Sequence, residues 1–273
     1  MRDPQRILIT GASAGLGEAL ALEHAAHGDA LVLLARRRDR LADVATRCRA
    51  LGAAVHSLPG DVTRPVDLRK AVALAQRHFG GLDVAYANAG YSQSGPLASL
   101  GAAAWRRQMD VNLDGVFHTV QACWPLLKTA RGRLGIVGSV VSYGGLADTG
   151  AYAASKGAVR GLAQVLDLEA RADGISVTFI APGFFRSEIR LKDADGRINV
   201  GAKEYLPAWL LGDAVALARA CRRAVAARRR ELVWPLHAKL AVFCLRHFPG
   251  LAQAAVGRLG AARMKRRQAV QGR

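Results

Sequence analysis

Short apolar runs recur along the first 235 residues, and segments with helical spacing lie between them. Leu16, Leu20, Leu22 and Ala26, for example, repeat with helical spacing before Gly28. Runs of four to six apolar residues bounded by turn residues are typical of strands buried in a parallel sheet. This alternation predicts an α/β fold, with strands expected at residues 7–10, 30–34, 54–58, 84–87, 134–138, 175–180 and 231–235.

Net charge divides the chain into an ordinary body and a basic tail. Of the formal charge of +18, residues 217–273 supply 14 lysines and arginines against one acid, whereas residues 1–216 hold 25 against 20. A chain of 273 residues is long enough to bury one large core. We therefore expect a single domain over residues 1–234 and a basic amphipathic extension over residues 235–273.

The sequence favours a cytoplasmic protein without a metal. Four widely spaced cysteines within apolar patterns indicate buried thiols in a reducing compartment, and the seven histidines show no metal-ligand spacing. Met1 leads through charged residues into the first strand, which leaves no room for a cleavable signal. No run approaches the ~18 apolar residues of a membrane span.

A glycine-rich loop from Thr10 to Gly17 follows the first strand, with glycines at positions 11, 15 and 17. Such a loop lets the backbone approach a pyrophosphate, whose charge is attracted by the start of the next helix. Alone, the loop indicates a dinucleotide and no particular chemistry. The second strand leads into Ala35 and Arg36, where an NAD enzyme usually carries an acid. An arginine there favours the 2′-phosphate of NADPH; the alternative is a solvated run of charges.

Tyr152 and Lys156 lie four residues apart, so on a helix they share one face. A phenol with a pKa of ~10 is a poor acid at neutral pH, and a neighbouring ammonium favours its ionised form. Ser139, 13 residues upstream, is a candidate to bind the oxygen that is protonated. The same spacing occurs by chance when a tyrosine packs beside a surface lysine, so the pair gains weight only together with the rest of the chain.

These motifs, in this order, resemble those of the short-chain dehydrogenase/reductase family over roughly residues 6–234. The resemblance rests on the Thr10–Gly17 loop, Asn88-Ala89-Gly90, Asn112, Ser139, Tyr152, Lys156 and Pro182-Gly183. It implies a Rossmann-like, doubly wound sheet of seven parallel strands in the order 3-2-1-4-5-6-7, with helices on both faces. It also implies a homodimer or homotetramer, commonly built on the helix that carries Tyr152.

The resemblance implies a role for each matching residue. Tyr152 would act as general acid, Lys156 would lower its pKa and bind the nicotinamide ribose, and Ser139 would orient the carbonyl. Asn112 would support the proton relay; from the residues alone it predicts a helix kink or cap. The remaining cofactor-binding residues would be Gly11, Ser13, Ala14, Gly15, Leu16, Gly17, Arg36, Asp61, Val62, Asn88, Ala89, Gly90, Pro182, Gly183 and Ser187.

Ala87 departs from the family pattern, and Asp61 allows more than one role. Ala87 stands where relatives commonly have a first asparagine, so we expect one structural hydrogen bond to be lost and the turn to remain. Asp61 either lies beside the adenine ring, caps the helix that begins near Pro65, or does both. Residues 184–212 mix apolar and charged side chains irregularly and are expected to form a lid over the substrate.

Beyond the last strand, an apolar pattern is flanked by cations. It predicts a helix that lies on an anionic membrane surface or, equally, one that folds over the pocket mouth with a frayed basic end. Nucleic-acid binding is not expected, because neither aromatic interleaving nor a recognised module accompanies the charge. The apolar positions are Leu236, Leu240, Phe243, Cys244, His247 and Leu251.

The sequence thus predicts an NADP(H)-dependent oxidoreductase that interconverts a ketone and a secondary alcohol. The apolar lid and tail favour a hydrophobic, lipid-like substrate such as a fatty 3-ketoacyl compound, a long-chain ketone or a sterol. The alternative is a non-catalytic nucleotide sensor or scaffold of the same fold. Such proteins usually lose the tyrosine or the lysine, and Ser139, Tyr152 and Lys156 are all present here.

Overall fold

A computed structural model describes residues 3–93, 95–185, 211–255 and 257–258. In this part of the chain one parallel sheet has the strand order β3-β2-β1-β4-β5-β6-β7, which confirms the predicted order. Observed strand boundaries lie within two residues of those expected. The strands are β1 (Arg6–Thr10), β2 (Ala30–Ala35), β3 (Val55–Pro59), β4 (Val84–Ala87), β5 (Arg133–Val137), β6 (Ser176–Pro182) and β7 (Glu231–Trp234).

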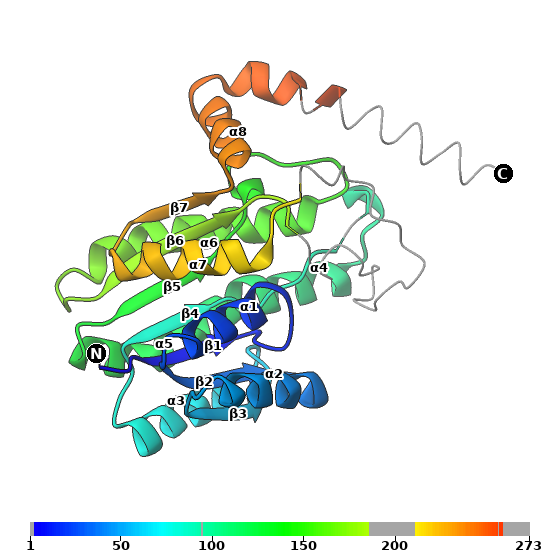
Figure 1. Cartoon of the computed structure of the whole chain (residues 1–273). Helices are drawn as coiled ribbons and strands as arrows, with labels where there is room; N and C mark the ends of the chain where they lie inside the picture. The colour runs from blue at the N-terminus through cyan, green and yellow to red at the C-terminus, as the bar shows by residue number, and fades with distance from the viewer. Residues whose placement is uncertain (1–2, 94, 186–210, 256, 259–273) are drawn as a thin grey trace.

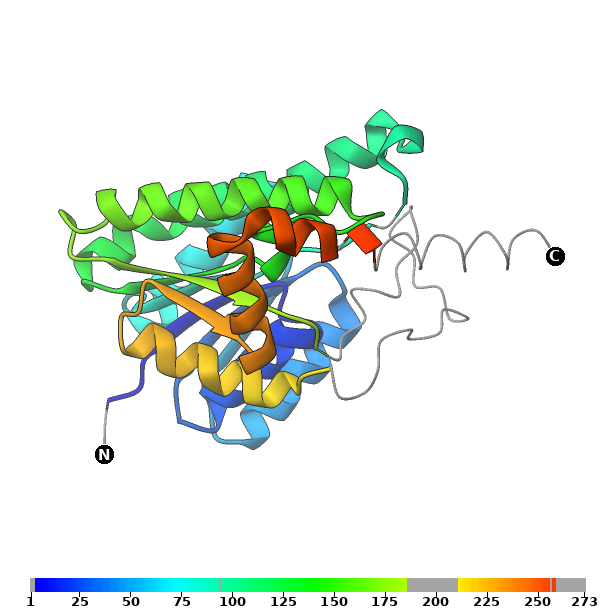
Figure 2. The ribbon, with the colours of Figure 1, turned by 90° about the horizontal axis from the view of Figure 1, so that it is seen from above.

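Helices cover both faces of the sheet (Figures 1 and 2). One face carries α1 (Gly15–Ala25), α2 (Arg38–Ala50) and α7 (Ala214–Ala226). The other carries α3 (Pro65–Phe79), α5 (Gly115–Thr129) and α6 (Gly150–Glu169), while α4 (Ala102–Met109) leads towards α5. Short 3-10 turns lie at Leu97–Ser99 and Val140–Ser142, and α8 (Leu236–His247) follows β7.

Alternate residues of the central strands supply the two hydrophobic cores. Ile7 and Ile9 point to the α1 side, whereas Leu8 between them points to the α3 side, and all three are fully buried. This follows from the two-residue period of a strand. Because both faces are covered, the strands read as continuous apolar runs, and this is why the sequence locates them well.

The kink predicted at Asn112 is a π-helical turn, Asp110–Asp114, between α4 and α5. Such turns insert an extra residue into a helix and are frequent at functional sites. Asn112 lies fully buried at the middle of this turn. The π-helical turn therefore places the Asn112 side-chain amide in the protein interior.

Asp61 does not cap α3, so that alternative is wrong. The N-cap is Arg64, which makes no side-chain capping bond, and Pro65 occupies the first helical position. Proline has no N–H that needs a capping partner, and it fixes the start of the helix four residues beyond Asp61. The Asp61 carboxylate instead accepts bonds from the backbone N–H and hydroxyl of Thr63, both at 3.0 Å.

The segment after β7 forms the predicted helix, α8, which lies beyond the β7 edge of the sheet (Figure 1). Its buried side chains are Ala238 and Val242, whereas Leu236, Leu240 and Phe243 of the predicted apolar pattern are more than half exposed. The predicted pattern therefore marks the outward face of the helix. Among the described residues, no helix combines the length and apolarity needed to cross a bilayer.

Most of the expected lid, residues 186–210, lies outside the described residues. Its two ends meet, because Phe185 and Gly212 form a parallel bridge and Gly212 N donates to Phe184 O at 2.9 Å. A side chain on Gly212 would lie 2.3 Å from the Trp234 ring. The end of β7 therefore fixes the base of this segment.

Candidate functional site

The glycine loop packs backbone against backbone with the turn after β4. Gly11 and Gly15 have positive φ angles of 67° and 59°, which favour glycine. A Cβ atom on Gly17 would lie 2.3 Å from the carbonyl oxygen of Gly11, and one on Gly11 would lie 2.8 Å from Cα of Ala89. Side chains at these positions would separate the loop from the turn, so the spacing of the glycines follows from the packing.

Thr10 joins these two segments by hydrogen bonds. Its hydroxyl accepts from the backbone N–H groups of Asn88 (3.0 Å) and Ala89 (3.1 Å) and donates to Tyr86 O (3.2 Å). The Asn88 amide donates back to Thr10 O at 2.8 Å. The turn is therefore retained although Ala87 replaces the first asparagine of the family pattern.

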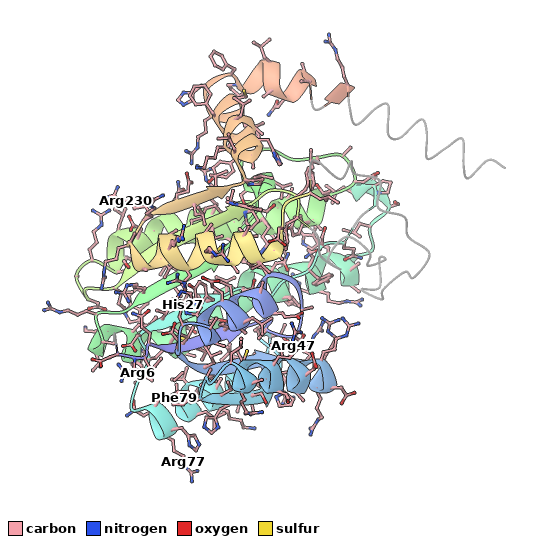
Figure 3. All side chains as sticks on the ribbon, viewed as in Figure 1. Arg6, His27, Arg47, Arg77, Phe79 and Arg230 are labelled. Carbon is pink, nitrogen blue, oxygen red and sulfur yellow. The ribbon has the colours of Figure 1, made fainter. Side chains whose placement is uncertain are left out.

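The start of α1 suits an anionic group. Its N-cap is Ala14, whose side chain cannot cap the first N–H groups, so these donors remain for a ligand. Glu18 in the first turn would oppose an anion, but Arg47 pairs with it at 2.6 Å. Arg47 is labelled on α2 in Figure 3. The glycine cradle, the uncapped helix start and the neutralised acid together fit the pyrophosphate of a dinucleotide.

Two arginines after β2 flank this loop differently. Arg37 contacts Ser13, with Nε 3.4 Å from the hydroxyl and an Nη 3.5 Å from the carbonyl oxygen. Arg36 is more exposed and lies 3.8 Å from a carboxylate oxygen of Asp61. Ser13 also lines an open groove of about 420 Å³ between α1 and α2. Arg37, more than the predicted Arg36, thus lies against the glycine loop.

Lys156 connects α6 to the carboxyl end of β5. Lys156 is 2 % exposed, and its ammonium group donates to Val137 O at 2.7 Å. Burial lowers the pKa of Lys156 to about 8. Ser139, two residues after Val137, is buried and accepts a bond from Val141 N at 3.3 Å. Tyr152 lies one turn before Lys156 on α6, so the structure brings Ser139, Tyr152 and Lys156 to one edge of the sheet.

Asn112 joins the π-helical turn to the segment after β4. Its amide oxygen accepts from Tyr91 N, and its amide nitrogen donates to Tyr91 O, both at 3.0 Å. The same nitrogen donates to the Ser155 hydroxyl at 3.1 Å, and Ser155 donates to Tyr152 O at 2.8 Å. Ser155 was missed in the sequence, although it lies inside the Tyr-x-x-x-Lys motif.

The other predicted positions lie around the same edge. A Cβ atom on Gly90 would be 3.2 Å from the Asn112 amide oxygen and 3.4 Å from the Lys156 ammonium. Pro182 ends β6, and Gly183 leaves room for Ala238 of α8. Ala14 and Leu16 lie at the start of α1, and Val62 packs against the start of α5. Ser187 lies outside the described residues.

The described residues contain no group of three or more histidines, cysteines, aspartates or glutamates placed to hold a metal ion. The polar side chains that the structure brings together here are those of Asn112, Ser139, Tyr152 and Lys156. Their arrangement offers a proton donor next to a buried cation, with an adjacent hydroxyl and a cradle for a dinucleotide.

Curated relatives match about two thirds of this chain. An 11-beta-hydroxysteroid dehydrogenase A of Sesamum indicum is 37% identical over 185 residues, which are 67% of this chain and 53% of that protein. An uncharacterized oxidoreductase of Staphylococcus aureus is 32% identical over 183 residues, 67% of this chain and 78% of that protein. The chain thus spans about half the length of the plant relatives.

Solved structures extend the similarity to most of the chain. An alcohol dehydrogenase of the archaeon Thermococcus sibiricus, complexed with 5-hydroxy-NADP, has a TM-score of 0.74 and 28% identity, covering 85% of this chain and 96% of that chain. A short-chain dehydrogenase/reductase of Burkholderia phymatum in complex with NAD has a TM-score of 0.78 and 26% identity, covering 88% and 92%.

The family model described as short chain dehydrogenase matches residues 5–197, which is more than half of the sequence. With the confirmed strand order, this match shows that the chain belongs to the short-chain dehydrogenase/reductase family.

Proposed function

We propose that this chain is an NADP(H)-dependent oxidoreductase that interconverts a ketone and a secondary alcohol. The observation that carries the proposal is the buried Lys156 ammonium, which lies one helical turn after Tyr152 and donates to Val137 O, two residues before Ser139. A charged group is buried at a cost, and such sites cluster where chemistry needs them. The dinucleotide cradle on the same edge of the sheet supplies the context.

The cofactor would transfer the hydride, and the protein side chains would transfer the proton and orient the substrate. When bound, the nicotinamide supplies or accepts the hydride. In the direction of reduction, the Tyr152 hydroxyl donates its proton to the carbonyl oxygen, and the Lys156 cation stabilises the phenolate that remains. The Ser139 hydroxyl donates a hydrogen bond to the same oxygen and so orients it. Asn112 holds the π-helical turn to Ser155, which fixes the start of α6 behind Tyr152.

The two arginines after β2 support a preference for NADPH. Arg37 lies against Ser13, and Arg36 lies near Asp61, so a 2′-phosphate between them would meet two cations. One oxygen of Asp61, predicted beside the adenine ring, accepts bonds from Thr63, and the other lies 3.8 Å from Arg36, so a 2′-phosphate would replace Asp61 as the partner of Arg36. Charge, more than shape, would thus distinguish the two cofactors.

A hydrophobic ketone suits the surroundings of the site. Phe184 and Phe185 follow Gly183 directly and lie at the base of the lid, next to Trp234. The plant relatives are named 11-beta-hydroxysteroid dehydrogenases, which fits a bulky apolar substrate without identifying it. The non-catalytic alternative gains no support, because every proposed catalytic side chain is present.

The proposed enzyme is a homo-oligomer in the cytoplasm. Phe117 of α5 and Val165 and Leu168 of α6 are large, apolar and about half exposed or more, so these helices offer a face for a second copy of the chain. Cys48, Cys123 and Cys221 are buried free thiols, which suits the reducing cytoplasm.

We further propose that the extension, residues 235–273, contacts an anionic bilayer. Leu236 and Leu251 are at least three quarters exposed, and Leu240, Phe243 and Phe248 are more than half exposed. The sequence after Glu231 contains eight lysines and arginines and no acid. A second copy would bring like charges together, whereas anionic lipid would attract them, so charge favours the bilayer.

Replacing Tyr152 by Phe removes the proposed proton donor and little else. We expect kcat for ketone reduction to fall more than about a hundredfold, while the Kd for NADPH, measured by fluorescence titration, changes little. Near-normal turnover of Tyr152→Phe would remove the mechanism. A wild-type protein that binds NADPH but reduces no ketone in a series of increasing chain length would favour the sensor alternative.

The buried Lys156 predicts a specific pH dependence of stability. Its pKa is about 8 in the folded protein, and a free lysine titrates near ~10.4. Between these values the unfolded chain binds the extra proton, so the contribution of this group to the free energy of unfolding rises with pH.

Urea unfolding at pH 7 and pH 10 measures the effect against Lys156→Met. We expect wild type to gain roughly 2–3 kcal/mol of unfolding free energy relative to the variant over this interval. Groups remote from Lys156 cancel in the comparison, and repeating it in a Tyr152→Phe background removes the phenol whose pKa Lys156 would lower. A difference that stays constant with pH would show that Lys156 titrates normally.

Cofactor preference should depend on the arginine that contacts Ser13. A charged hydrogen bond contributes about 1.5–3 kcal/mol, so Arg37→Met should lower the kcat/KM ratio of NADPH to NADH about tenfold or more. Arg38→Met is the matched control, because Arg38 is exposed at the start of α2. Equal kcat/KM values for both cofactors in wild type would contradict the assignment.

Vesicle sedimentation tests the bilayer contact on the full chain, because α8 packs on the body and truncation after Pro235 would disturb it. Binding should rise with anionic lipid and fall partly with salt. Phe243→Ser should weaken it about tenfold through lost apolar burial, whereas Leu51→Ser, equally exposed on another face, should not. Equal binding to neutral and anionic vesicles would exclude this contact. So would the absence of binding to anionic vesicles at low salt.

A further inference from the structure

Tyr143 ends the short turn that begins at Ser139. Ser142 N donates to Ser139 O at 3.0 Å, and Tyr143 N donates to Val140 O at 3.1 Å. The Ser139 hydroxyl itself accepts from Val141 N. The position of Ser139 is therefore tied through one 3-10 turn to the position of Tyr143.

Three charged residues from distant parts of the chain hold the Tyr143 side chain. The phenol donates to a carboxylate oxygen of Glu231, and both oxygens of that carboxylate accept from Arg246, at 2.7 and 2.9 Å. The guanidinium carbons of Arg160 and Arg246 lie over the phenol ring, 4.3 and 4.8 Å from its centre. We refer to Tyr143, Arg160, Glu231 and Arg246 as the Tyr143 cluster.

The cluster joins the Ser139 turn to α6, β7 and α8. Arg160 lies one helical turn after Lys156 on α6, and so belongs to the same stripe as Tyr152. Glu231 begins β7 and Arg246 lies in the last turn of α8. The Ser139 turn is thus fixed to the Tyr152 helix on one side and to α8 on the other.

Neighbouring packing leaves the turn little freedom. A Cβ atom on Gly144 would lie 2.7 Å from Leu245 of α8, so this helix presses on the residue after Tyr143. At the other end, a Cβ atom on Gly138 would lie 2.1 Å from the ring of Phe179, whose centre is 6.3 Å from that of Tyr143. Packing against Phe179 therefore restricts the start of the turn, and packing against Leu245 of α8 restricts its end.

We propose that Tyr143 and Arg246 are positioning residues that fix Ser139 relative to Tyr152. This inference rests on the proposed reaction, in which both hydroxyls act on one oxygen atom. A displacement of about 1 Å at such a site can lower turnover about a hundredfold. The C-terminal extension would then be part of the catalytic apparatus, through a residue remote from the substrate.

A purely structural role makes a different prediction. The Arg246 and Glu231 side chains are 40 % and 30 % exposed, and ion pairs with such exposure contribute little to global stability. Loss of the pair should therefore leave the melting temperature nearly unchanged. An effect on turnover without an effect on melting would mark positioning.

The test uses the full chain with Arg246→Met, Arg246→Lys and Tyr143→Phe, and Lys239→Met as control for a cation on the same helix. Hydrogen–deuterium exchange of a peptide spanning residues 139–146 reports the turn directly, because the amides of Val141, Ser142 and Tyr143 are bonded within it. Steady-state kinetics and NADPH titration are measured on the same samples, with Tyr152→Phe as the inactive reference.

We expect Arg246→Met to speed exchange in this peptide and to lower kcat about tenfold or more, with the Kd for NADPH and the melting temperature unchanged. Arg246→Lys should recover part of kcat because it retains a charge for Glu231, and Lys239→Met should resemble wild type. Adding Tyr143→Phe to Arg246→Met should cause little further loss, because both act through one cluster.

Two results would overturn the inference. Unchanged exchange in Arg246→Met would show that the cluster does not hold the turn. Faster exchange with unchanged kcat would show that the held turn does not position Ser139. A wild-type protein that reduces no ketone would instead count against the proposed reaction, and exchange would still decide whether the cluster holds the turn.

Discussion

The burial of one ammonium group constrains much of this structure. Lys156 has almost no contact with solvent, and its bond to Val137 O is the interaction that offsets part of the lost hydration. That bond requires α6 to lie directly against the end of β5. The same contact brings Ser139, the residue after Gly138, to the end of β5 against which α6 and Tyr152 lie.

Backbone contact around the dinucleotide cradle is the second constraint, and the sequence reveals it well. Gly11 and Gly17 leave room for the Asn88-Ala89 turn, and Thr10 joins loop and turn by hydrogen bonds. Only glycine fits these positions sterically, so the glycines in the sequence indicate where the loop and the turn approach each other. The strands were predictable for another reason, because their continuous apolar runs mark a sheet covered on both faces, and the family resemblance supplied their order.

Interactions that depend on distant partners were not predictable. Tyr143 and Glu231 are 88 residues apart in sequence, and no local pattern marks them as a pair. The prediction that Asp61 caps α3 was wrong, because Pro65 fixes the start of the helix and Arg64 is the N-cap residue. Arg36 stands at the expected position after β2, yet its neighbour Arg37 contacts Ser13, since side-chain direction at a strand end depends on the helix that follows.

The C-terminal helix shows why an apolar pattern alone cannot identify the buried face. On α8 the small residue Ala238 permits close approach to Gly183, and Leu245 fills the space beside Gly144. The larger side chains Leu236 and Leu240 point away from the body. A helix that approaches the body closely through Ala238, with Val242 and Leu245 packed beside it, can keep its other large apolar residues outward without losing its attachment. Because Arg246 on this helix also bonds Glu231, whatever covers the outward face would act on an element already joined to the Ser139 turn.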